Sequence, residues 1–462
     1  MASIVFFSVK KTAQTSRRCL SSHLKGLANS GDSGWSFCAT HNPSASLFPG
    51  ARWCSRGTGA RFMSHGTAGR SAAGRTRRGA LALSGAAAVT AAAAVAGFLA
   101  NTDHFQRAEM ATRVPRADEN KRTAAAEEEE GDIAERCRGF MSPPVTDISV
   151  LQKRKEEMST KMEMLIMETQ ADFCKALEEV DGGTFRVDRW DRKEGGGGIS
   201  CVMQDGKVFE KAGVNVSVVF GNLTEEAAKQ MRSRGKVLKG KDGKLPFCAM
   251  GVSSVIHPKN PHIPTVHFNY RYFEIEEEDG TKQWWFGGGT DLTPVYINKE
   301  DGLHFHKTLK EACDKHHPQY YPDFKKWCDR YFYIRHRGET RGIGGIFFDD
   351  LDSPNQKEAF DFVKSCARTV VPCYLPIVHK HLNDSFTAEE KNWQQIRRGR
   401  YVEFNLVYDR GVKFGLATPG SRIESILMSL PLTATWEYMH EPAKGSREAD
   451  MMEALRNPKE WV

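Results

Sequence analysis

The chain has 462 residues and a formal net charge of +7, a balance that by itself would be compatible with a nucleic-acid-binding protein. The charge is unevenly distributed, because residues 1–103 carry 12 Lys and Arg against two acids, whereas residues 104–462 carry 53 against 56. The positive charge therefore belongs to the first hundred residues, and a nucleic-acid partner loses its main support.

Residues 1–110 have the composition of a mitochondrial targeting sequence: they are rich in Arg, Ser, Ala and Gly and poor in acids. Arg75, Arg77 and Arg78 precede an Ala-rich apolar run at 79–100, which is long enough to reach across a bilayer but only weakly hydrophobic. This order predicts import, arrest at the inner membrane and cleavage that releases the protein into the intermembrane space. The alternative is that the run is kept as a single-pass anchor.

The segment 111–136 is polar, with four consecutive glutamates, and is predicted to be a charged linker. The folded, catalytic part is then expected at 137–462. Eleven cysteines are scattered along the chain without a C-x-x-C pair, so we expect free, buried thiols rather than a zinc site, an iron–sulfur cluster or a disulfide framework.

The hydrophobic periodicity predicts an α+β fold. A long helix at 147–180 is expected to end at Gly182, and an Asp205-Gly206 turn predicts a β-hairpin. The remaining predicted elements are strands at 184–190, 199–204 and 214–223, a mainly helical stretch at 299–337, extended structure at 337–351, helices at 355–383 and 387–398, and a strand at 401–411. Strands outnumber what βαβ alternation allows, which favours one domain with a large, mainly antiparallel sheet and helices packed against it.

The stretch 257–296 contains two strand-like runs with polar residues among aromatic ones. His267, Asn269 and Arg271 recur with period 2, so their side chains would project from one face of a strand. The second run, WWFGGGTD, ends at Asp291. A base, an amide, a cation and a carboxylate beside large rings suit a pocket for a flat or cyclic charged ligand, although a solvated sheet face explains the alternation as well.

Other residues point to the ligand's charge. Several arginines occur beside glycines in turn-rich segments, and together they favour a carboxylate- or phosphate-bearing substrate, although each one alone is explained as well by a surface ion pair. They are Arg271, Arg335, Arg337, Arg341, Arg400, Arg410 and Arg422. Asp409 is a second candidate carboxylate or a simple turn residue. His304 and His306 are only weakly compatible with a non-haem iron site, so no protein-held metal is expected.

The motifs HFNYRYFE, WWFGGGTDLTPVY, RGIGGIFFDDL and YVEFNLVYDRGVKFGLATPGSRIESILMSLP closely resemble those of the oxygen-dependent coproporphyrinogen-III oxidases of haem biosynthesis. The resemblance covers residues 137–462, and the two-part leader is similar to that of the animal mitochondrial form. It implies conversion of two propionates of coproporphyrinogen III to vinyl groups, giving protoporphyrinogen IX, CO2 and hydrogen peroxide. It further implies a sheet flanked by helices on both sides and a homodimer. Molecular oxygen would be the co-substrate, and no metal or organic cofactor is implied.

The same resemblance assigns roles to individual residues. His267 is implied as the proton donor, and Asp291 and Asp409 as important carboxylates. The implied substrate contacts are Ser253, Asn269, Tyr270, Arg271, Gly420, Ser421 and Arg422. Dimer contacts are implied at about 202–211 and 401–437, and peripheral association with the inner mitochondrial membrane is left open.

The chemistry of the substrate agrees with this set, since a carboxylate can accept the converging N–H groups of the four pyrroles. Which of Asp291, Asp409 and His267 acts as the base stays open at this level. A non-haem iron oxygenase and a non-catalytic tetrapyrrole carrier are the alternative functions.

Overall fold

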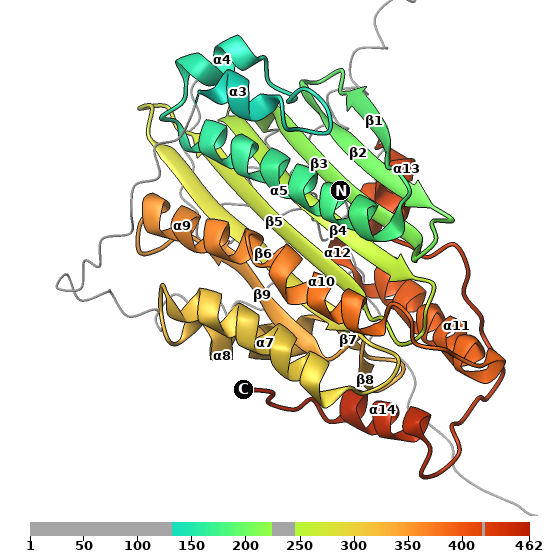
Figure 1. Ribbon diagram of the computed structural model, residues 1–462. Coiled ribbons are helices and arrows are strands. Elements are labelled where there is room, and N and C mark those ends of the chain that lie inside the picture. The colour runs from blue at the N-terminus through green and yellow to red at the C-terminus, as the bar shows by residue number, and fades with distance from the viewer. Residues whose placement is uncertain (1–131, 224–244, 418–420) are drawn as a thin grey trace, which may run out of the picture. The chain divides into compact units, whose positions relative to one another are not determined.

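The computed structural model describes residues 132–223, 245–417 and 421–462 (Figure 1). The predicted presequence, its apolar run, nearly all of the predicted linker and Gly420 lie outside these residues. Helix α3 (Ile133–Cys137) packs its two end residues against Leu151 and Met164, so the described fold already includes the last residues of that linker. No helix within the described ranges is both long and apolar enough to cross a membrane.

A seven-stranded antiparallel sheet forms the centre of the fold, in the order β1-β2-β3-β4-β5-β6-β9. Its strands are β1 (Arg186–Asp191), β2 (Gly196–Gln204), β3 (Phe209–Leu223), β4 (Leu245–Pro258), β5 (Thr265–Glu276), β6 (Lys282–Thr293) and β9 (Gly344–Leu351). A small second ladder joins β7 (Tyr333–Ile334) to β8 (Glu339–Thr340). The predicted α+β class with a large antiparallel sheet is confirmed.

The long helices cover one face of this sheet. The helices after α3 are α4 (Ile148–Lys153), α5 (Met158–Asp181), α7 (Lys299–Asp314), α8 (Tyr320–Tyr331), α9 (Gln356–Ala367), α10 (Val370–His381), α11 (Ala388–Glu403), α12 (Arg410–Ala417), α13 (Ile423–Leu427) and α14 (Arg447–Arg456). Figure 1 shows α5, α9 and α10 crossing the face of the sheet that is turned toward the viewer. Phe268 and Tyr270 of β5 lie in the main core, and the Phe268 ring meets Phe173 of α5 edge-on at 5.1 Å between centroids.

The C-terminal segment covers part of the opposite face. Ser425 of α13 places its Oγ 2.8 Å from the Oγ of Ser200 on β2, and a Cβ at Gly213 of β3 would touch Met428. In Figure 1, α12 and α13 accordingly lie behind the sheet. The expectation of helices on both sides is therefore confirmed.

The strand predicted at 401–411 is wrong. Helix α11 instead continues into a π-helix, η2 (Phe404–Tyr408), and α12 follows after Asp409. The segment is rich in β-formers, but Tyr401, Phe404 and Tyr408 recur at helical spacing and pack on the β7–β9 side of the molecule. Tertiary packing thus overrides local strand propensity here.

Two predicted long helices are each divided. The helix expected at 147–180 is interrupted at Arg154–Glu157, and the one expected at 355–383 is split into α9 and α10 at Arg368 and Thr369. Helix α5 ends as expected, because Gly182 adopts φ 74° at its C-cap.

We expect Asp181→Ala to destabilise the fold by about 3 kcal/mol, because this buried carboxylate accepts backbone N–H groups of Lys207, Val208 and Phe209 at 2.8–3.0 Å. The substitution would leave those donors of the β2–β3 hairpin without their partner. Urea denaturation followed by circular dichroism measures the change, with exposed Glu179→Ala on the same helix as the control. Equal stability of the two variants would contradict this account.

Candidate functional site

The face of the sheet opposite α5 carries rows of polar side chains. Because register partners in a sheet share a face, one row runs through Ser200, Asn215, Ser253 and Asn269, ending at Gly289. All four polar residues are buried. His267 and Arg271 lie on the same face two positions either side of Asn269, which confirms the predicted one-sided arrangement on β5.

A buried chain of charge-assisted hydrogen bonds joins His267, Asp291 and Arg341. His267 and Asp291 are register partners on β5 and β6, and His267 Nδ1 lies 2.6 Å from Asp291 Oδ1. Arg341 Nη2 donates to Asp291 Oδ2 at 2.8 Å. The carboxylate of Asp291 is therefore bonded through both of its oxygens, one to each neighbour.

Arg341 is held by aromatic rings as well as by Asp291. Its guanidinium carbon lies 4.0 Å from the Phe332 ring centroid, 4.5 Å from that of Tyr401 and 5.0 Å from that of Phe404. Its Nη1 also donates to Asn405 Oδ1 at 3.1 Å, so the π-helix η2 takes part in fixing it. Only 2% of its side chain is exposed, and this environment excludes water from the ion pair.

The charge of Asp291 follows from these contacts. Burial raises the pKa of its carboxyl, but the nearby Arg341 and His267 outweigh that effect, so the pKa lies below its ordinary value. An ionised carboxylate only accepts hydrogen bonds, so His267 Nδ1 carries the proton in this pair. The other ring nitrogen of His267, Nε2, is then the one that can exchange a proton with a ligand.

Arg271 crosses the site beside a glycine floor. Its Nη2 donates to Asp349 Oδ1 on β9 at 2.7 Å, and its Nη1 donates to Asn269 Oδ1. A Cβ at Gly287, its register partner, would stand 2.7 Å from the guanidinium. Glycine is thus needed there for the arginine to lie flat against β6.

Of the other predicted site residues, some lie in this site and others do not. Ser253 belongs to the polar row, next to Asn269. Tyr270 points to the opposite face, where its hydroxyl lies 2.6 Å from Thr290 Oγ1 in the core, so its side chain is not part of this site.

Two further predicted residues are bonded to groups other than His267 and Asp291. Asp409 caps α12, since its Oδ1 accepts from the backbone N–H of Val412 at 2.8 Å, and its Oδ2 accepts from Tyr331 Oη at 3.3 Å. Arg422 is paired with Asp188 of β1, and Ser421 precedes it at the start of α13.

Three residues of this site, Arg341, Asp349 and Asn405, carry no signal of their own in the sequence. Arg341 was only one of seven arginines near glycines, and it lies 50 positions from its partner Asp291. No local periodicity connects such distant residues, although the RGIGGIFFDD segment that contains Arg341 and Asp349 is the signal that could have drawn attention to them.

The two histidines that were weakly compatible with a metal site, His304 and His306, form hydrogen bonds to other groups. His304 Nε2 lies 3.0 Å from the carbonyl of Pro372, and His306 contacts Tyr321 Oη and the carbonyl of Ile343. Among the residues that the structure describes, no cluster of three or more His, Cys, Asp or Glu has the arrangement of a metal site.

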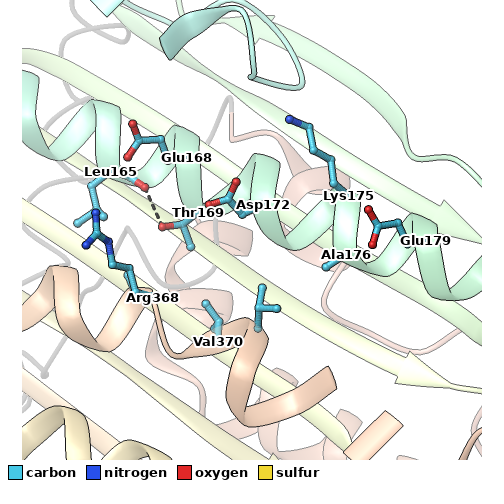
Figure 2. Close-up of a pocket in the computed structure, with 11 residues that line it drawn as sticks. Leu165, Glu168, Thr169, Asp172, Lys175, Ala176, Glu179, Arg368 and Val370 are labelled. Atoms are coloured by element: carbon cyan, nitrogen blue, oxygen red, sulfur yellow. Dashed lines mark hydrogen bonds between the residues drawn. The ribbon is translucent and has the colours of Figure 1, made fainter. Parts of the chain in front are cut away.

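A surface groove of about 420 Å³ lies between α5 and the start of α10. Figure 2 shows Glu168, Thr169 and Asp172 of α5 along one side of it and Arg368 and Val370 on the other. It contains none of the predicted site residues and lies over the opposite face of the sheet.

Comparison with known proteins gives a consistent result. The family model described as coproporphyrinogen III oxidase matches residues 161–461. The chain is 70% identical to the human mitochondrial oxygen-dependent coproporphyrinogen-III oxidase over 80% of this chain and 83% of that protein. It is 65% identical to the oxygen-dependent coproporphyrinogen-III oxidase of Drosophila melanogaster over 70% of this chain and 83% of that protein. It is 57% identical to the chloroplastic enzyme of Glycine max over 65% of this chain and 79% of that protein.

Replacing Arg341 by Met should destabilise the protein by about 3–5 kcal/mol, because it leaves a buried carboxylate without its cation. The pKa of Asp291 lies below its unfolded value, so its ionisation contributes stability that is present at neutral pH and lost as the pH falls through the folded-state pKa. Without Arg341 that pKa rises. The deficit of the variant is therefore expected to be largest near pH 7 and to narrow toward about pH 4.

Chemical denaturation across this pH range measures the effect. The double variant Arg341→Met/Asp291→Asn is the control, and it should recover part of the lost stability because no uncompensated charge remains. A pH-independent deficit, unchanged in the double variant, would show that the ion pair is not its cause.

Proposed function

Because the chain belongs to the coproporphyrinogen III oxidase family, we propose that it converts two propionate side chains of coproporphyrinogen III to vinyl groups with molecular oxygen. Each propionate, one O2 and one proton yield a vinyl group, CO2 and hydrogen peroxide. Two such steps give protoporphyrinogen IX in porphyrin biosynthesis. The structural observation that best supports this reading is the buried His267–Asp291–Arg341 chain beside a row of polar side chains and glycines.

His267 is the proton carrier in this proposal. Asp291 holds the proton on Nδ1 and orients the ring, which leaves Nε2 to exchange protons with the macrocycle or with the propionate chain. Because Asp291 is already bonded to His267 and Arg341, its role is to position and polarise His267 rather than to collect pyrrole N–H groups. Asp291 is thus a positioning residue.

The substrate supplies the reducing power. Removing a pyrrole N–H proton makes the electron-rich macrocycle reactive toward O2, so the proposal requires neither a metal nor an organic cofactor. The low exposure of His267, Asn269 and Arg271 supports a site that shields the reactive ring from unwanted oxidation.

Arginines are suited to hold the propionates. Arg271 lies on the site face of β5, and Arg422 stands at the start of α13, over the edge formed by β1. Both are already paired with a carboxylate, Asp349 and Asp188, which fixes their position before a ligand arrives. Asp409 lies on the Tyr331 side of the site and remains a proposed second carboxylate.

The mammalian relatives are named mitochondrial, and the protein is accordingly assigned to the mitochondrion. The Arg-rich leader followed by the apolar run at 79–100 supports the intermembrane space as the compartment, and peripheral contact with the inner membrane is part of this proposal.

A homodimer is proposed through about 202–211 and 401–437. Large apolar side chains of the second range are unusually exposed: Leu406, Val407, Leu416, Ile423, Leu432 and Trp436, of which Val407 is 48% and Trp436 52% exposed. Several exposed, large apolar side chains within one segment are typical of a surface that a partner covers, and a symmetric pair of chains would cover it on both copies.

We expect His267→Gln to lower kcat at least 100-fold with a smaller change in KM, since the proton carrier is lost while the substrate contacts remain. The measurement is O2 uptake and CO2 release by metal-free, chelator-treated protein supplied with coproporphyrinogen III. His304→Gln is the matched control and should behave like the wild type, since His304 is a half-buried histidine on α7 that bonds the carbonyl of Pro372.

Equal amounts of O2 consumed and CO2 released by the wild type would support the proposed reaction. Activity that disappears with the metal would instead indicate an iron oxygenase. Binding without any O2-dependent CO2 release would indicate a carrier.

Val407→Asp should weaken the proposed dimer by at least 10-fold in dissociation constant, because a charge would be desolvated in the apolar interface. Sedimentation velocity over a concentration series measures this change. Leu303→Asp is the control, since Leu303 of α7 is equally exposed at 48% but lies outside the proposed interface. A monomeric wild type, or equal behaviour of both variants, would rule out this surface.

A further inference from the structure

Tyr331, the last residue of α8, lies between the sheet and the C-terminal helices. Its ring stacks on that of Phe347 on β9, with 4.3 Å between the ring centroids and 17° between the planes. The guanidinium carbon of Arg410, the first residue of α12, lies 4.9 Å from the Tyr331 centroid. One side chain thus contacts both a strand of the sheet and the start of a C-terminal helix.

Phe347 brings these contacts onto the site face of the sheet. Its register partner on β6 is Gly289, the glycine at the end of the polar row, and a Cβ there would lie 2.9 Å from Cδ2 of the Phe347 ring. The guanidinium carbon of Arg271 lies 5.7 Å from the centroid of the same ring. Stacking and cation–π contacts therefore connect Arg271 to Arg410 through two aromatic rings.

The hydroxyl of Tyr331 reaches the carboxylate that precedes α12. Its Oη donates to Asp409 Oδ2 at 3.3 Å, while Asp409 Oδ1 accepts from the backbone N–H of Val412 at 2.8 Å. Burial raises the pKa of Tyr331, and the nearby Asp409 raises it further, so the hydroxyl keeps its proton and is the donor. The two oxygens of Asp409 are thus bonded on opposite sides, one to its own helix and one to Tyr331.

Packing alone does not account for the bond to Asp409. Tyr331 is half-buried, and a phenylalanine in its place would make the same ring contacts without this bond. The next residue, Phe332, supports an arginine with its ring alone, since the ring centroid lies 4.0 Å from the guanidinium carbon of Arg341. The hydroxyl of Tyr331 therefore points to a role in holding Asp409.

Two parts of the chain supply the residues proposed for the substrate. Arg271 belongs to β5 of the sheet, whereas Asp409 stands directly before α12. We propose that Tyr331 is a positioning residue that sets the separation between these two parts. The proposal rests on the proposed function, which makes Arg271 and Asp409 neighbours of the macrocycle. A ligand that must reach both parts at once is sensitive to small changes in their separation.

Tyr331→Phe tests the hydroxyl, because it keeps the ring and removes only the bond to Asp409. The substitution should lower kcat/KM about 5-fold, the effect of losing one hydrogen bond to a charged group. In an Asp409→Ser background, where the serine still caps α12 but no longer reaches Tyr331, it should lower kcat/KM less than about 2-fold. An equal factor in both backgrounds would show that Tyr331 does not act through Asp409.

Tyr331→Leu removes the ring as well, so Arg410 and Phe347 both lose this aromatic neighbour. We expect kcat/KM to fall further, by about 10- to 100-fold, because the start of α12 is no longer held against the sheet. The phenylalanine variant should retain most of the activity that the leucine variant loses. Equal activity of the two variants would show that the ring does not position this part of the site.

Tyr296→Phe is the matched control, because Tyr296 makes the same kinds of contact with α14. Its hydroxyl donates to Glu448 at 2.7 Å, and the guanidinium carbon of Arg447 lies 4.1 Å from its ring centroid. The control should lose about as much stability in urea denaturation as Tyr331→Phe and keep the wild-type kcat/KM. An equal loss of kcat/KM in the control would mean that general destabilisation, not positioning, lowers the activity.

Binding of coproporphyrin III, the oxidised macrocycle with the same four propionates, separates this proposal from the proposed reaction. Quenching of its fluorescence gives a dissociation constant without turnover, and Tyr331→Leu should raise that constant about 10-fold or more. Wild-type binding that is unchanged in Tyr331→Leu would overturn the positioning role alone. Absence of binding by the wild type would overturn the proposed function, and the positioning role with it.

Discussion

The buried ion pair between Asp291 and Arg341 is the interaction on which the rest of the site depends. A carboxylate at 2% exposure would be protonated, or would destabilise the fold, without a cation at hydrogen-bond distance. Once ionised, it sets the tautomer of His267 and leaves one defined ring nitrogen for chemistry. The cation in turn needs a place, and Phe332, Tyr401 and Phe404 provide it.

That requirement explains the form of the C-terminal half. Tyr401, Phe404 and Asn405 can all reach Arg341 only if the chain is helical there, and the π-turn of η2 brings Asn405 round to the guanidinium. As a strand, residues 401–411 would place alternate side chains on opposite sides and could not surround one group. Helical structure in this segment is thus a consequence of the site rather than of local preference.

Features that depend on neighbouring residues could be predicted from the sequence. The period-2 placement of His267, Asn269 and Arg271 was predictable, because neighbours on one strand report their own geometry. The α+β class was predictable for the same reason, from short strands and their turns. Tyr270 shows the limit of carrying roles over residue by residue, since it alternates to the core face although both of its neighbours face the site.

What was not predictable depends on long-range contacts. Several hydrogen bonds join residues 50 to 225 positions apart, and no pattern within a short window of sequence indicates such pairs. The pairs are Arg341 with Asp291, Arg271 with Asp349, and Ser200 with Ser425. The sequence also gives no sign that Asn215 Nδ2 and Ser217 Oγ on β3 are buried without a hydrogen-bond partner among the described residues. VNVSVV reads as an ordinary buried strand until its register shows which glycines stand beside it.

The π-helix η2 also connects the site with the proposed interface. Asn405 points inward to Arg341, whereas the next two residues, Leu406 and Val407, are among the exposed apolar side chains. Glu403, one residue before η2, accepts hydrogen bonds from His336 and Arg337. Burial raises the pKa of its carboxyl, but these bonds outweigh that effect and lower the pKa to about 2. The turn is therefore clamped at its start and cannot shift as an independent loop. A partner that packs on Leu406 and Val407, as in the proposed dimer, would act on the same few residues that hold Arg341, and it would thereby couple assembly to the geometry of His267 through one short helical turn.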